Sequence, residues 1–426
     1  MTKLIKLLMV VCLFIAVQSG LYAKYICIID AGSSGSRIWL YNVEFDSAKG
    51  TVNAAEIALD KSKSKTKPGI AAFANVDSKK IQTEIANYFA AMLGEVTEKA
   101  KAAGCDPKTI PIYLLATAGM RIVSPTDQTY IYSELIKYLS TTGFIVDEKS
   151  SAKTISGEME GVFDWLAVNW KNNISRANNP TLGVMDMGGA SMQVVYATPM
   201  NSGKGIQPVK IGDIDPIKYN VYSKSYLGLG ADYARYQYSD DLNCFFKGFY
   251  TPGKGGNYGS GLVDVDRLLT SVARLEPIPF DKMNAPMEFC AISAFNTIAK
   301  SEHFKFNTTM SIPEMVDKGN VLAENTWQSL EKEAQSNPYL FSLMFTSQHI
   351  IEVLRDLGFT DDKKIQLSDA SWPIGAAIYL AYNNTTLQQG VNLVGAEQEQ
   401  EQEQSGNLAA LQGGWDSESA DIWIGE

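Results

Sequence analysis

The sequence is poor in the side chains that most often carry acid–base and metal chemistry. Among its 426 residues there are 2 histidines and 5 cysteines. His303 and His349 sit among apolar or aromatic neighbours, so we expect them to pack in helices or strands rather than form a catalytic dyad or metal cluster. No Cys-x-x-Cys pair occurs, which argues against structural zinc. Any chemistry must therefore run on carboxylates, hydroxyls and backbone amides.

Long apolar runs are also missing. The longest, Leu7 to Val17, is shorter than the roughly 20 residues that span a bilayer. Two lysines precede this run and small or polar residues follow it, the layout of a secretory signal peptide over Met1–Ala23. We expect cleavage near Ala23 and a soluble, secreted or periplasmic mature protein. An uncleaved anchor is the alternative.

Basic residues are outnumbered by acidic ones, and the formal net charge is −10. An acidic protein favours neither nucleic acid nor an anionic membrane surface as a partner. We expect a monomer, although charge alone leaves the oligomeric state open. An anionic substrate would need local compensation from cations or backbone amides.

Few cysteines remain for cross-linking once Cys12 leaves with the leader. Cys27, Cys105, Cys244 and Cys290 could pair in an oxidising compartment. We favour a disulfide between Cys244 and Cys290. The alternative for Cys27 is a buried small hydrophobe within a strand.

The first part of the chain alternates strand-like and helix-like segments, which indicates an α/β domain. The predicted strands are Tyr25–Asp30, Arg37–Phe45 and Ile110–Ala116, and the predicted helices are Ser78–Ala103 and Asp127–Leu139. A second α/β stretch follows, with a helix at Gly157–Trp170 and strands at Leu182–Asp186 and Met192–Ala197. We expect a loop-rich insertion from Met200 to Lys282, where specificity could be built.

The end of the chain changes composition to alternating glutamate and glutamine. Residues 396–426 lack the apolar density to fold by themselves, so we expect a disordered acidic tail. A role in binding a partner is the alternative.

A weak internal repeat is the most informative feature. Ile28–Ile38 resembles Val184–Val194, since each has an apolar strand, an aspartate, a turn of small residues and a returning strand. Two related lobes would place both turns against one ligand. Chance similarity of two hairpins is the alternative.

Both turns have the composition that binds phosphate through backbone amides. Gly32–Ser36 and Gly188–Ser191 are small enough for close approach of a phosphate. Asp30 and Asp186, just before the turns, are candidates to hold a divalent cation directly or through water.

Two glutamates, Glu158 and Glu160, stand beside glycines at the predicted start of a helix. Either could serve as the base that activates a water. Solvated helix-start glutamates that match the helix dipole are the alternative.

Five sequence blocks together resemble the apyrase, or nucleoside triphosphate diphosphohydrolase, family. They occur in the family's order at residues 30–37, 116–121, 155–161, 186–193 and 371–375. Each block alone is weak, and five in order are specific. The chain is most similar to soluble members, including those that bacteria secrete.

The resemblance implies an α/β, actin-like fold of two ribonuclease-H-like lobes with the active site between them. Lobe I would comprise residues 24–154, completed by a C-terminal helix at 376–395. Lobe II would comprise residues 155–375. The implied activity is hydrolysis of the terminal phosphates of nucleoside tri- and diphosphates by direct attack of water on a metal-bound nucleotide.

The resemblance also implies roles for individual residues. Glu160 would be the base, Ser191 and Gln193 would orient the water, and Thr117 would line the site. Asp30 and Asp186 would hold a hydrated Mg²⁺, Ca²⁺ or Mn²⁺. Phosphate-binding candidates are Ser33, Ser34, Gly35, Ser36, Ala118, Gly188, Gly189 and Ala190. Arg37 and Arg121 would either neutralise phosphate charge or form structural salt bridges.

For the nucleobase, the family uses aromatic stacking from the second lobe. Tyr339, Phe345 and Trp372 are the candidates, with core packing as the alternative for each. Neither the base preference nor the choice between tri- and diphosphate follows from the sequence.

Three other functions compete with the apyrase interpretation. An exopolyphosphatase shares the Asp-turn and glutamate-glycine blocks. Sugar kinases and chaperone ATPases share the two-lobed fold but normally lack a signal peptide. A nucleotide-binding protein without turnover would have no need for Glu160, Ser191 and Gln193 together.

Overall fold

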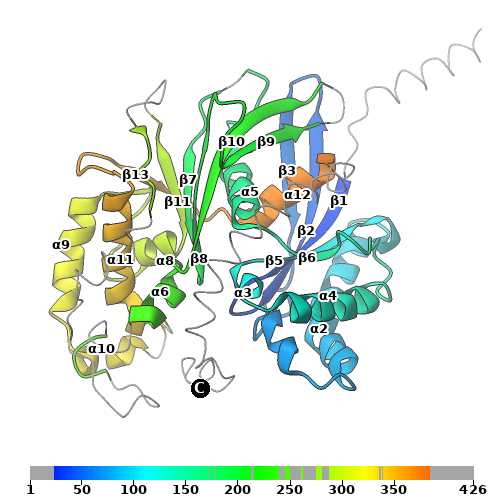
Figure 1. Cartoon of the computed structure of the whole chain (residues 1–426), viewed down its shortest axis with the longest axis horizontal. Coiled ribbons are helices and arrows are strands. Elements are labelled where there is room, and N and C mark those ends of the chain that lie inside the picture. The colour runs from blue at the N-terminus through cyan, green and yellow to red at the C-terminus, as the bar shows by residue number, and fades with distance from the viewer. Residues whose placement is uncertain are drawn as a thin grey trace, which may run out of the picture.

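The computed structural model describes most of the chain between residues 24 and 383. The described residues are 24–171, 173–177, 179–212, 215–238, 245–249, 261, 275–280, 287–334, 337 and 339–383. The predicted signal peptide, the acidic tail and residues 384–395 of the predicted last helix lie outside them. Two mixed sheets, each flanked by helices, make up the described part (Figure 1).

The first sheet runs in the order β3-β2-β1-β5-β6, with the short β4 paired to β2. Its central strand β1 is antiparallel to β2 and parallel to β5. The bounds are β1 (Lys24–Ala31), β2 (Ser36–Asp46), β3 (Thr51–Ile57), β4 (Lys65–Thr66), β5 (Ile112–Ala116) and β6 (Ala152–Thr154). The predicted strands of this region are confirmed within one or two residues.

Strand β1 contributes to a separate core on each face of this sheet, because its alternate side chains point to opposite faces. Cys27 and Ile29 enter a core shared with α2 (Ile81–Ala102) and α4 (Pro125–Leu139). Ile26 and Ile28 enter a different core on the other face. Both predicted helices are present. The sheet is therefore buried on both sides, which explains its continuous apolar strands.

The second sheet runs in the order β12-β13-β11-β7-β8-β10-β9. Here β7 is antiparallel to β8 and parallel to β11, the same arrangement as β1 with β2 and β5. The bounds are β7 (Gly183–Met187), β8 (Ser191–Ala197), β9 (Ile206–Ile211), β10 (Ile217–Leu227), β11 (Phe289–Ser293), β12 (Thr309–Met310) and β13 (Ile365–Leu367). The strands of the two sheets thus follow the same order, as the predicted α/β, actin-like architecture requires. The predicted fold class is confirmed.

The predicted loop-rich insertion is wrong over its first part. Strands β9 and β10 and helix α6 (Ala231–Tyr238) occupy residues that we expected to be loops. These strands lie at one end of the sheet and carry many polar residues, which obscure the alternation of buried positions along β10. Pairing with β8 supplies the stability that local sequence does not signal.

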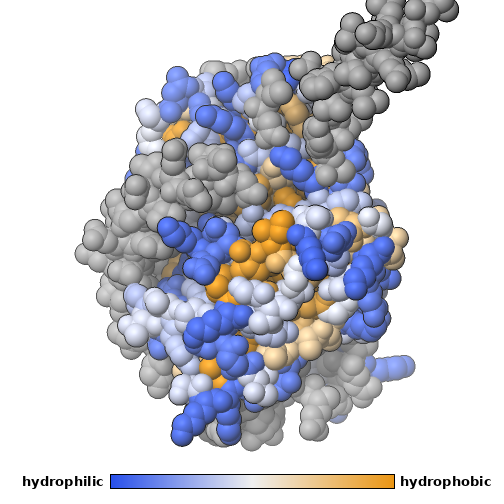
Figure 2. All heavy atoms as spheres, turned by 90° about the vertical axis from the view of Figure 1, so that its right-hand side faces the viewer, coloured by the Kyte–Doolittle hydropathy of each residue, from blue (hydrophilic) through white to orange (hydrophobic). Residues whose placement is uncertain are grey.

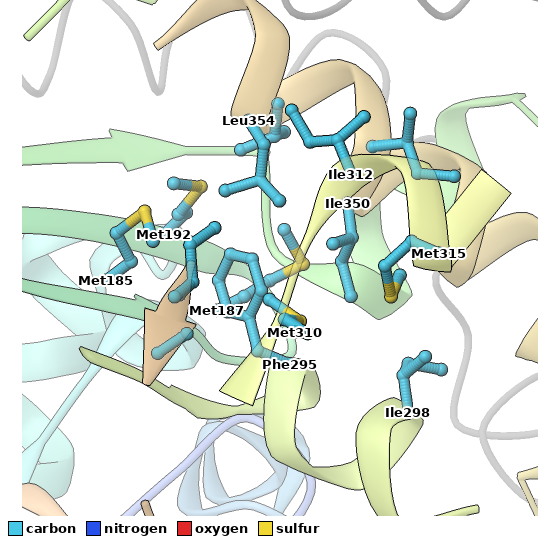
Figure 3. Close-up of a cluster of buried hydrophobic side chains, with 14 of the residues drawn as sticks. Met185, Met187, Met192, Phe295, Ile298, Met310, Ile312, Met315, Ile350 and Leu354 are labelled. Carbon is cyan, nitrogen blue, oxygen red and sulfur yellow. The ribbon is translucent and has the colours of Figure 1, made fainter. Parts of the chain in front are cut away.

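Methionines fill much of the core between the second sheet and its helices (Figure 3). Met185, Met187 and Met192 from the sheet meet apolar residues of α8 (Ala294–Lys300) and α11 (Leu343–Asp356). Helices α9 (Ile312–Ala323) and α10 (Trp327–Ala334) complete this side. Methionine adapts to irregular gaps, so it suits a core formed between a sheet and several helices.

Two helices, α5 (Gly157–Asn169) and α12 (Trp372–Asn383), lie between the sheets and share one core with residues of both (Figure 1). They pack closely, since a Cβ at Gly375 would lie 1.8 Å from the carbonyl oxygen of Phe163. Helix α12 contacts β1 of the first sheet and β9 of the second, and α5 contacts β7, β8 and β10 of the second. The predicted lobe boundaries at residues 154 and 375 stay predictions.

The cysteines do not form the expected cross-link. Cys27, Cys105 and Cys290 are free thiols, and Cys244 lies outside the described residues. Cys290 is buried within β11, which is flanked by β7 and β13. The predicted Cys244–Cys290 bond is therefore not present. Cys27 is a buried strand residue, as the alternative expectation held.

The histidines take part in packing and in one surface pair. His349 is fully buried in α11 and donates a hydrogen bond from Nε2 to the carbonyl oxygen of Leu229 over 3.0 Å. His303 is half-buried, with Nε2 3.0 Å from a carboxylate oxygen of Glu333. Neither joins a metal cluster within the described ranges.

The outer surface of the first-sheet side mixes polar and apolar residues. Figure 2 shows polar residues surrounding a smaller apolar area on this face. Among the helices that the structure describes, none combines the length and apolarity needed to cross a membrane.

Candidate active site

The two predicted phosphate turns have the same backbone construction. The amide of Gly32 donates to the carbonyl oxygen of Gly35 over 2.9 Å, and that of Gly188 donates to the carbonyl oxygen of Ser191 over 3.0 Å. In the register of the strands, Asp30 faces Arg37 and Asp186 faces Gln193. The internal repeat is thus a structural repeat, and the alternative of chance similarity is wrong.

The two turns approach each other across the molecule. A Cβ at Gly189 would lie 3.0 Å from the Oγ of Ser33, so a side chain there would press on the first turn. Ala118, at the start of the short helix α3 (Ala118–Arg121), shares a small apolar cluster with Ala190. The first, second and fourth sequence blocks therefore meet at one place.

Helix α5 carries the candidate base into the same place. Its N-cap residue Ser156 accepts a hydrogen bond from the amide of Met159 over 3.1 Å, which starts the helix. A Cβ at Gly157 would lie 2.0 Å from the Oγ of Ser225, and one at Gly161 would lie 2.5 Å from that of Ser223. Both glycines are required because they let α5 press against β10.

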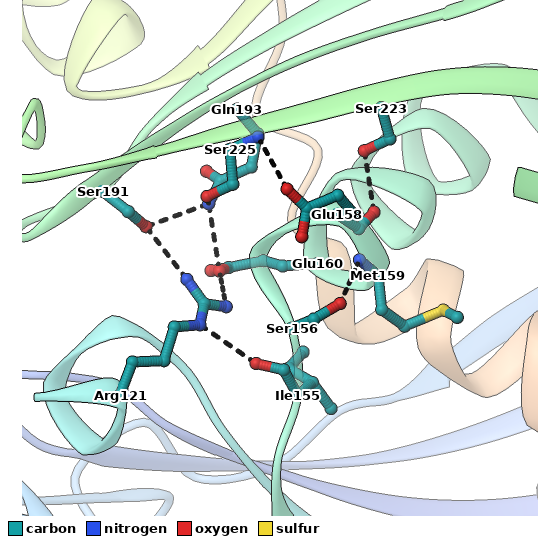
Figure 4. Close-up of polar contacts among 10 residues, drawn as sticks. All are labelled: Arg121, Ile155, Ser156, Glu158, Met159, Glu160, Ser191, Gln193, Ser223 and Ser225. Carbon is teal, nitrogen blue, oxygen red and sulfur yellow. Dashed lines mark hydrogen bonds and ion pairs between the residues drawn. The ribbon is translucent and has the colours of Figure 1, made fainter. Parts of the chain in front are cut away.

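A buried hydrogen-bond network joins the candidate base to the residues predicted to orient water (Figure 4). The Nε2 of Gln193 donates to Oε2 of Glu160 over 3.1 Å and to the Oγ of Ser191 over 2.9 Å. Arg121 Nη2 forms an ion pair with the same Oε2 at 2.6 Å. The structure therefore brings together Glu160, Ser191 and Gln193, and adds Arg121.

The two candidate cation ligands are buried carboxyl groups. Burial raises the pKa of Asp30 to about 7, with Arg37 at 3.8 Å lowering it and the charges of Glu160 and Asp186 raising it. Burial likewise raises the pKa of Asp186 to about 7, and the charge of Glu160 adds to the shift. Excess negative charge accumulates here, as expected where a cation is to be held.

Sequence reasoning missed a further carboxyl group in this cluster. Asp164 lies one helical turn after Glu160 and is fully buried. Burial raises the pKa of Asp164 well above its usual range, and the nearby charges of Asp186 and Glu160 raise it further. The available signal was the four-residue spacing from Glu160, which places both groups on one helix face.

The residues fit a hydrated cation better than an all-protein cage. Within the described ranges, no group of three or more His, Cys, Asp or Glu residues is arranged to hold a metal. Asp186 Oδ1 is buried and accepts no hydrogen bond from the described residues. Magnesium in particular is often held by one or two carboxylates while it keeps several waters, so Asp30 and Asp186 suffice as ligands.

Several predicted phosphate-site residues take positions that refine their expected roles. Thr117 is buried, and its amide donates to the carbonyl oxygen of Ala31 at the end of β1. The Ser36 hydroxyl is buried and accepts a hydrogen bond from the Tyr88 hydroxyl, which indicates that Ser36 stabilises the first turn and does not contact a ligand. Arg37 is largely exposed. Ser33, Ser34, Gly35, Gly188 and Gly189 form the two turns and are not fully buried.

Glu158 is not the fully solvated helix-start glutamate of the alternative expectation. It is half-buried, and its Oε1 lies 3.4 Å from the backbone amide of Ser225 on β10. Its backbone carbonyl accepts a hydrogen bond from Ser223 over 2.7 Å. Glu158 thus fastens α5 to the second sheet, while Glu160 reaches the network.

Only one of the three nucleobase candidates is exposed. Tyr339 is 57% exposed. Phe345 is fully buried and stacks on His349, with ring centroids 5.7 Å apart. Trp372 is 6% exposed and stacks on Phe163. Phe345 and Trp372 therefore pack in the core, which corrects their prediction as stacking partners for a base.

Curated relatives of the chain include nucleoside triphosphate diphosphohydrolases and apyrases. Human ectonucleoside triphosphate diphosphohydrolase 7 is 27% identical over 253 residues, covering 51% of this chain and 40% of that protein. The Golgi apyrase of Schizosaccharomyces pombe is 30% identical over 236 residues, covering 50% and 40%. For such relatives, the match spans about two fifths of their length. Probable apyrase 3 of Arabidopsis thaliana is 26% identical over 414 residues, covering 83% and 82%.

The fold has a counterpart among solved structures. A nucleoside triphosphate hydrolase crystal structure from Neospora caninum aligns with a TM-score of 0.58 at 12% identity, over 89% of this chain and 96% of that one. At this identity the similarity supports the fold alone. All these organisms are eukaryotes, so the predicted likeness to secreted bacterial members stays a prediction.

A family match covers most of the site. Residues 18–247 match the GDA1/CD39 (nucleoside phosphatase) family. This range includes the first four sequence blocks, both turns and the network around Glu160. Since it spans more than half of the sequence, the chain belongs to the GDA1/CD39 (nucleoside phosphatase) family.

Proposed function

We propose that this chain hydrolyses the terminal phosphates of nucleoside tri- and/or diphosphates and releases orthophosphate. The observation that carries the proposal is the buried network of Glu160, Ser191 and Gln193 beside two equivalent turns. A protein that only bound nucleotides would gain nothing from a carboxylate and a water-orienting pair at this position. Family membership supports the same reaction class.

In the proposed reaction, water attacks the terminal phosphorus directly. Glu160 takes a proton from the water while Ser191 and Gln193 hold its oxygen. The new bond forms between water oxygen and phosphorus, and the bond from phosphorus to the leaving phosphate oxygen breaks. The products are orthophosphate and a nucleotide shortened by one phosphate, with no phosphoenzyme.

Backbone amides of the two turns would hold the phosphates. Ser33 belongs to the first turn, and Gly189 and Ala190 belong to the second, with Ala118 beside them. Asp30 and Asp186 would hold the hydrated cation. When bound, Mg²⁺, Ca²⁺ or Mn²⁺ neutralises phosphate charge and so favours attack by water.

The proposal extends to base recognition and to location. Tyr339 is the candidate for stacking on the nucleobase because it alone of the three aromatic candidates is exposed. Export follows from the leader-like composition of Met1–Ala23, which makes a secreted or periplasmic protein our working assignment. The acidic net charge of −10 speaks against a nucleic-acid partner.

Phosphate release from several substrates tests the reaction class. The protein is assayed with ATP, ADP, AMP and polyphosphate, first with magnesium or calcium and then with excess chelator. We expect release from ATP or ADP that the chelator stops, and none from AMP. Release from polyphosphate alone would identify an exopolyphosphatase, and no release from any of the four would leave nucleotide binding without turnover.

Glu160→Gln tests the assigned base. The amide keeps the bulk but cannot accept the proton, so we expect turnover to fall by at least about 10³-fold while nucleotide binding survives. The matched control is Glu158→Gln, a neighbour on the same helix, which should keep most of the activity. The opposite ranking of the two variants would transfer the role of base to Glu158.

A further inference from the structure

We infer that Arg121 is a positioning residue that aligns the base Glu160 with Ser191, and that it does not bind phosphate. The inference rests on the proposed function for the identity of the base. It departs from the expectation that Arg121 neutralises phosphate charge, and chooses between the two roles that the sequence left open.

The guanidinium of Arg121 contacts three separated parts of the site (Figure 4). Its Nε donates to the carbonyl oxygen of Ile155 over 3.0 Å, just before α5. Its Nη2 pairs with Glu160 Oε2 at 2.6 Å, and its Nη1 lies 3.4 Å from the Oγ of Ser191. The rigid fork of arginine can hold three acceptors in one plane, which a lysine ammonium cannot do at these positions.

Arg121 is far more buried than Arg37, the other arginine that could bind phosphate. The Arg121 side chain is 3% exposed, and its partner Glu160 is 8% exposed. The Arg37 side chain is 57% exposed and lies 3.8 Å from Asp30. Releasing Arg121 to a phosphate would leave Glu160 as a buried carboxylate without its cation, which is costly. Arg37 could turn to a phosphate with little loss.

The contacts also assign different tasks to the two oxygens of Glu160. Arg121 and Gln193 both donate to Oε2. Among the described residues, no hydrogen bond ends on Oε1. Holding Oε2 therefore fixes the carboxylate plane and leaves Oε1 to accept the proton of the attacking water.

The position of Arg121 makes base alignment depend on both sheets. Arg121 follows β5 of the first sheet, whereas Ser191 begins β8 of the second. Both contacts of the guanidinium hold only when the two sheets keep their present spacing. A change in the distance between the two turns would therefore disturb the alignment of Glu160.

Steady-state kinetics of Arg121→Met and Arg121→Lys test the inference. We expect Arg121→Met to lower kcat by about 100-fold, with KM and the affinity for a non-hydrolysable ATP analogue changed less than about threefold. Arg121→Lys should recover part of kcat because it restores the charge without the fork. A tenfold rise in KM and in the analogue's dissociation constant, with kcat largely kept, would instead make Arg121 a phosphate ligand and overturn the inference.

Two further measurements separate positioning from loss of folding and from failure of the proposed function. The surface variant Arg355→Met, in a pair with Glu352 at 3.0 Å, is the control for removing an arginine. In the double variant Arg121→Met/Glu160→Gln the buried charge disappears, so analogue binding should remain. Unfolding of the four proteins of this cycle should be strongly non-additive even if no substrate is turned over. Additive effects would show that Arg121 does not hold Glu160.

Discussion

The two turns are built alike in backbone and differ in the side chain opposite the aspartate. Arg37 faces Asp30 in the first, and Gln193 faces Asp186 in the second. Arg37 is largely exposed, whereas Gln193 is 1% exposed and reaches Glu160. The two hairpins are therefore two different half-sites, and in the proposed reaction the first brings positive charge and the second orients water.

The difference follows from what packs against each hairpin. Helix α5 lies on β8 and β10, and a Cβ at Gly161 would be 3.5 Å from that of Gln193. The Arg37 position pairs with the two-residue strand β4 instead, which leaves its side chain in solvent. A buried amide can hold a water in place, while an exposed cation can only attract charge.

Gln193→Leu should have the largest effect, because it makes the second half-site unable to orient water. The variant loses the donors to Glu160 and Ser191 while keeping the side-chain volume. We expect kcat to fall by about 10³-fold with KM nearly unchanged. Initial-rate kinetics measure this, and a fall confined to KM would contradict the division of labour between the turns.

Acid should weaken the second half-site through His349. Burial lowers its pKa from 6.5 to about 4, and its ring supports Leu229, whose neighbour Gly228 donates to the carbonyl oxygen of Ala190. Since the unfolded chain takes up this proton below pH 6.5 and the folded chain does not, stability falls as pH drops from 6.5 to 4.

The cost should approach about 3 kcal/mol at pH 4, from the size of the shift in pKa. Chemical denaturation of the wild type and of His349→Gln, compared at each pH, isolates this histidine from the titrating carboxyl groups. Equal pH slopes for the two proteins would show that His349 does not carry the effect.

Gly189→Ala should damage the site more than Gly32→Ala, although both glycines belong to turns that are built alike. An added Cβ at Gly189 meets Ser33 Oγ at 3.0 Å and Asp232 Oδ2 at 3.1 Å, whereas at Gly32 the nearest atom is 3.4 Å away. We expect the first change to cost about 1–3 kcal/mol of stability and to weaken nucleotide binding. Thermal unfolding and analogue titration compare them, and equal losses would mean that the turns do not press on each other.

Arg37→Gln should have the smallest effect, because it gives the first half-site the residue type of the second. An exposed pair of this kind contributes about 0–1 kcal/mol, so KM should rise only a few-fold while kcat holds. Substrate titrations at low and high salt check this, since screening should shrink the difference. A large loss of kcat would show that Arg37 acts on the reacting phosphate.

The site was partly predictable because its parts are local. A strand that ends in an aspartate and a turn of small residues determine their own hydrogen bonds, so Asp30, Asp186 and both turns were recognisable from short segments. Glu160 was recognisable because its block also sets a helix start. Strands β9 and β10, the free thiol of Cys290 and the burial of Phe345 were not, since each depends on distant partners.

The sequence by itself determined the two small-residue turns, the carboxylates that precede them and the helix that carries Glu160. The tertiary structure alone decided that Arg121 reaches a serine 70 residues away, that Asp164 joins the carboxylate cluster and that Arg37 stays in solvent. The reason is physical: turns and caps are stabilised by neighbours a few residues away, whereas burial and charge pairing depend on how α5 packs against the strands of the second sheet.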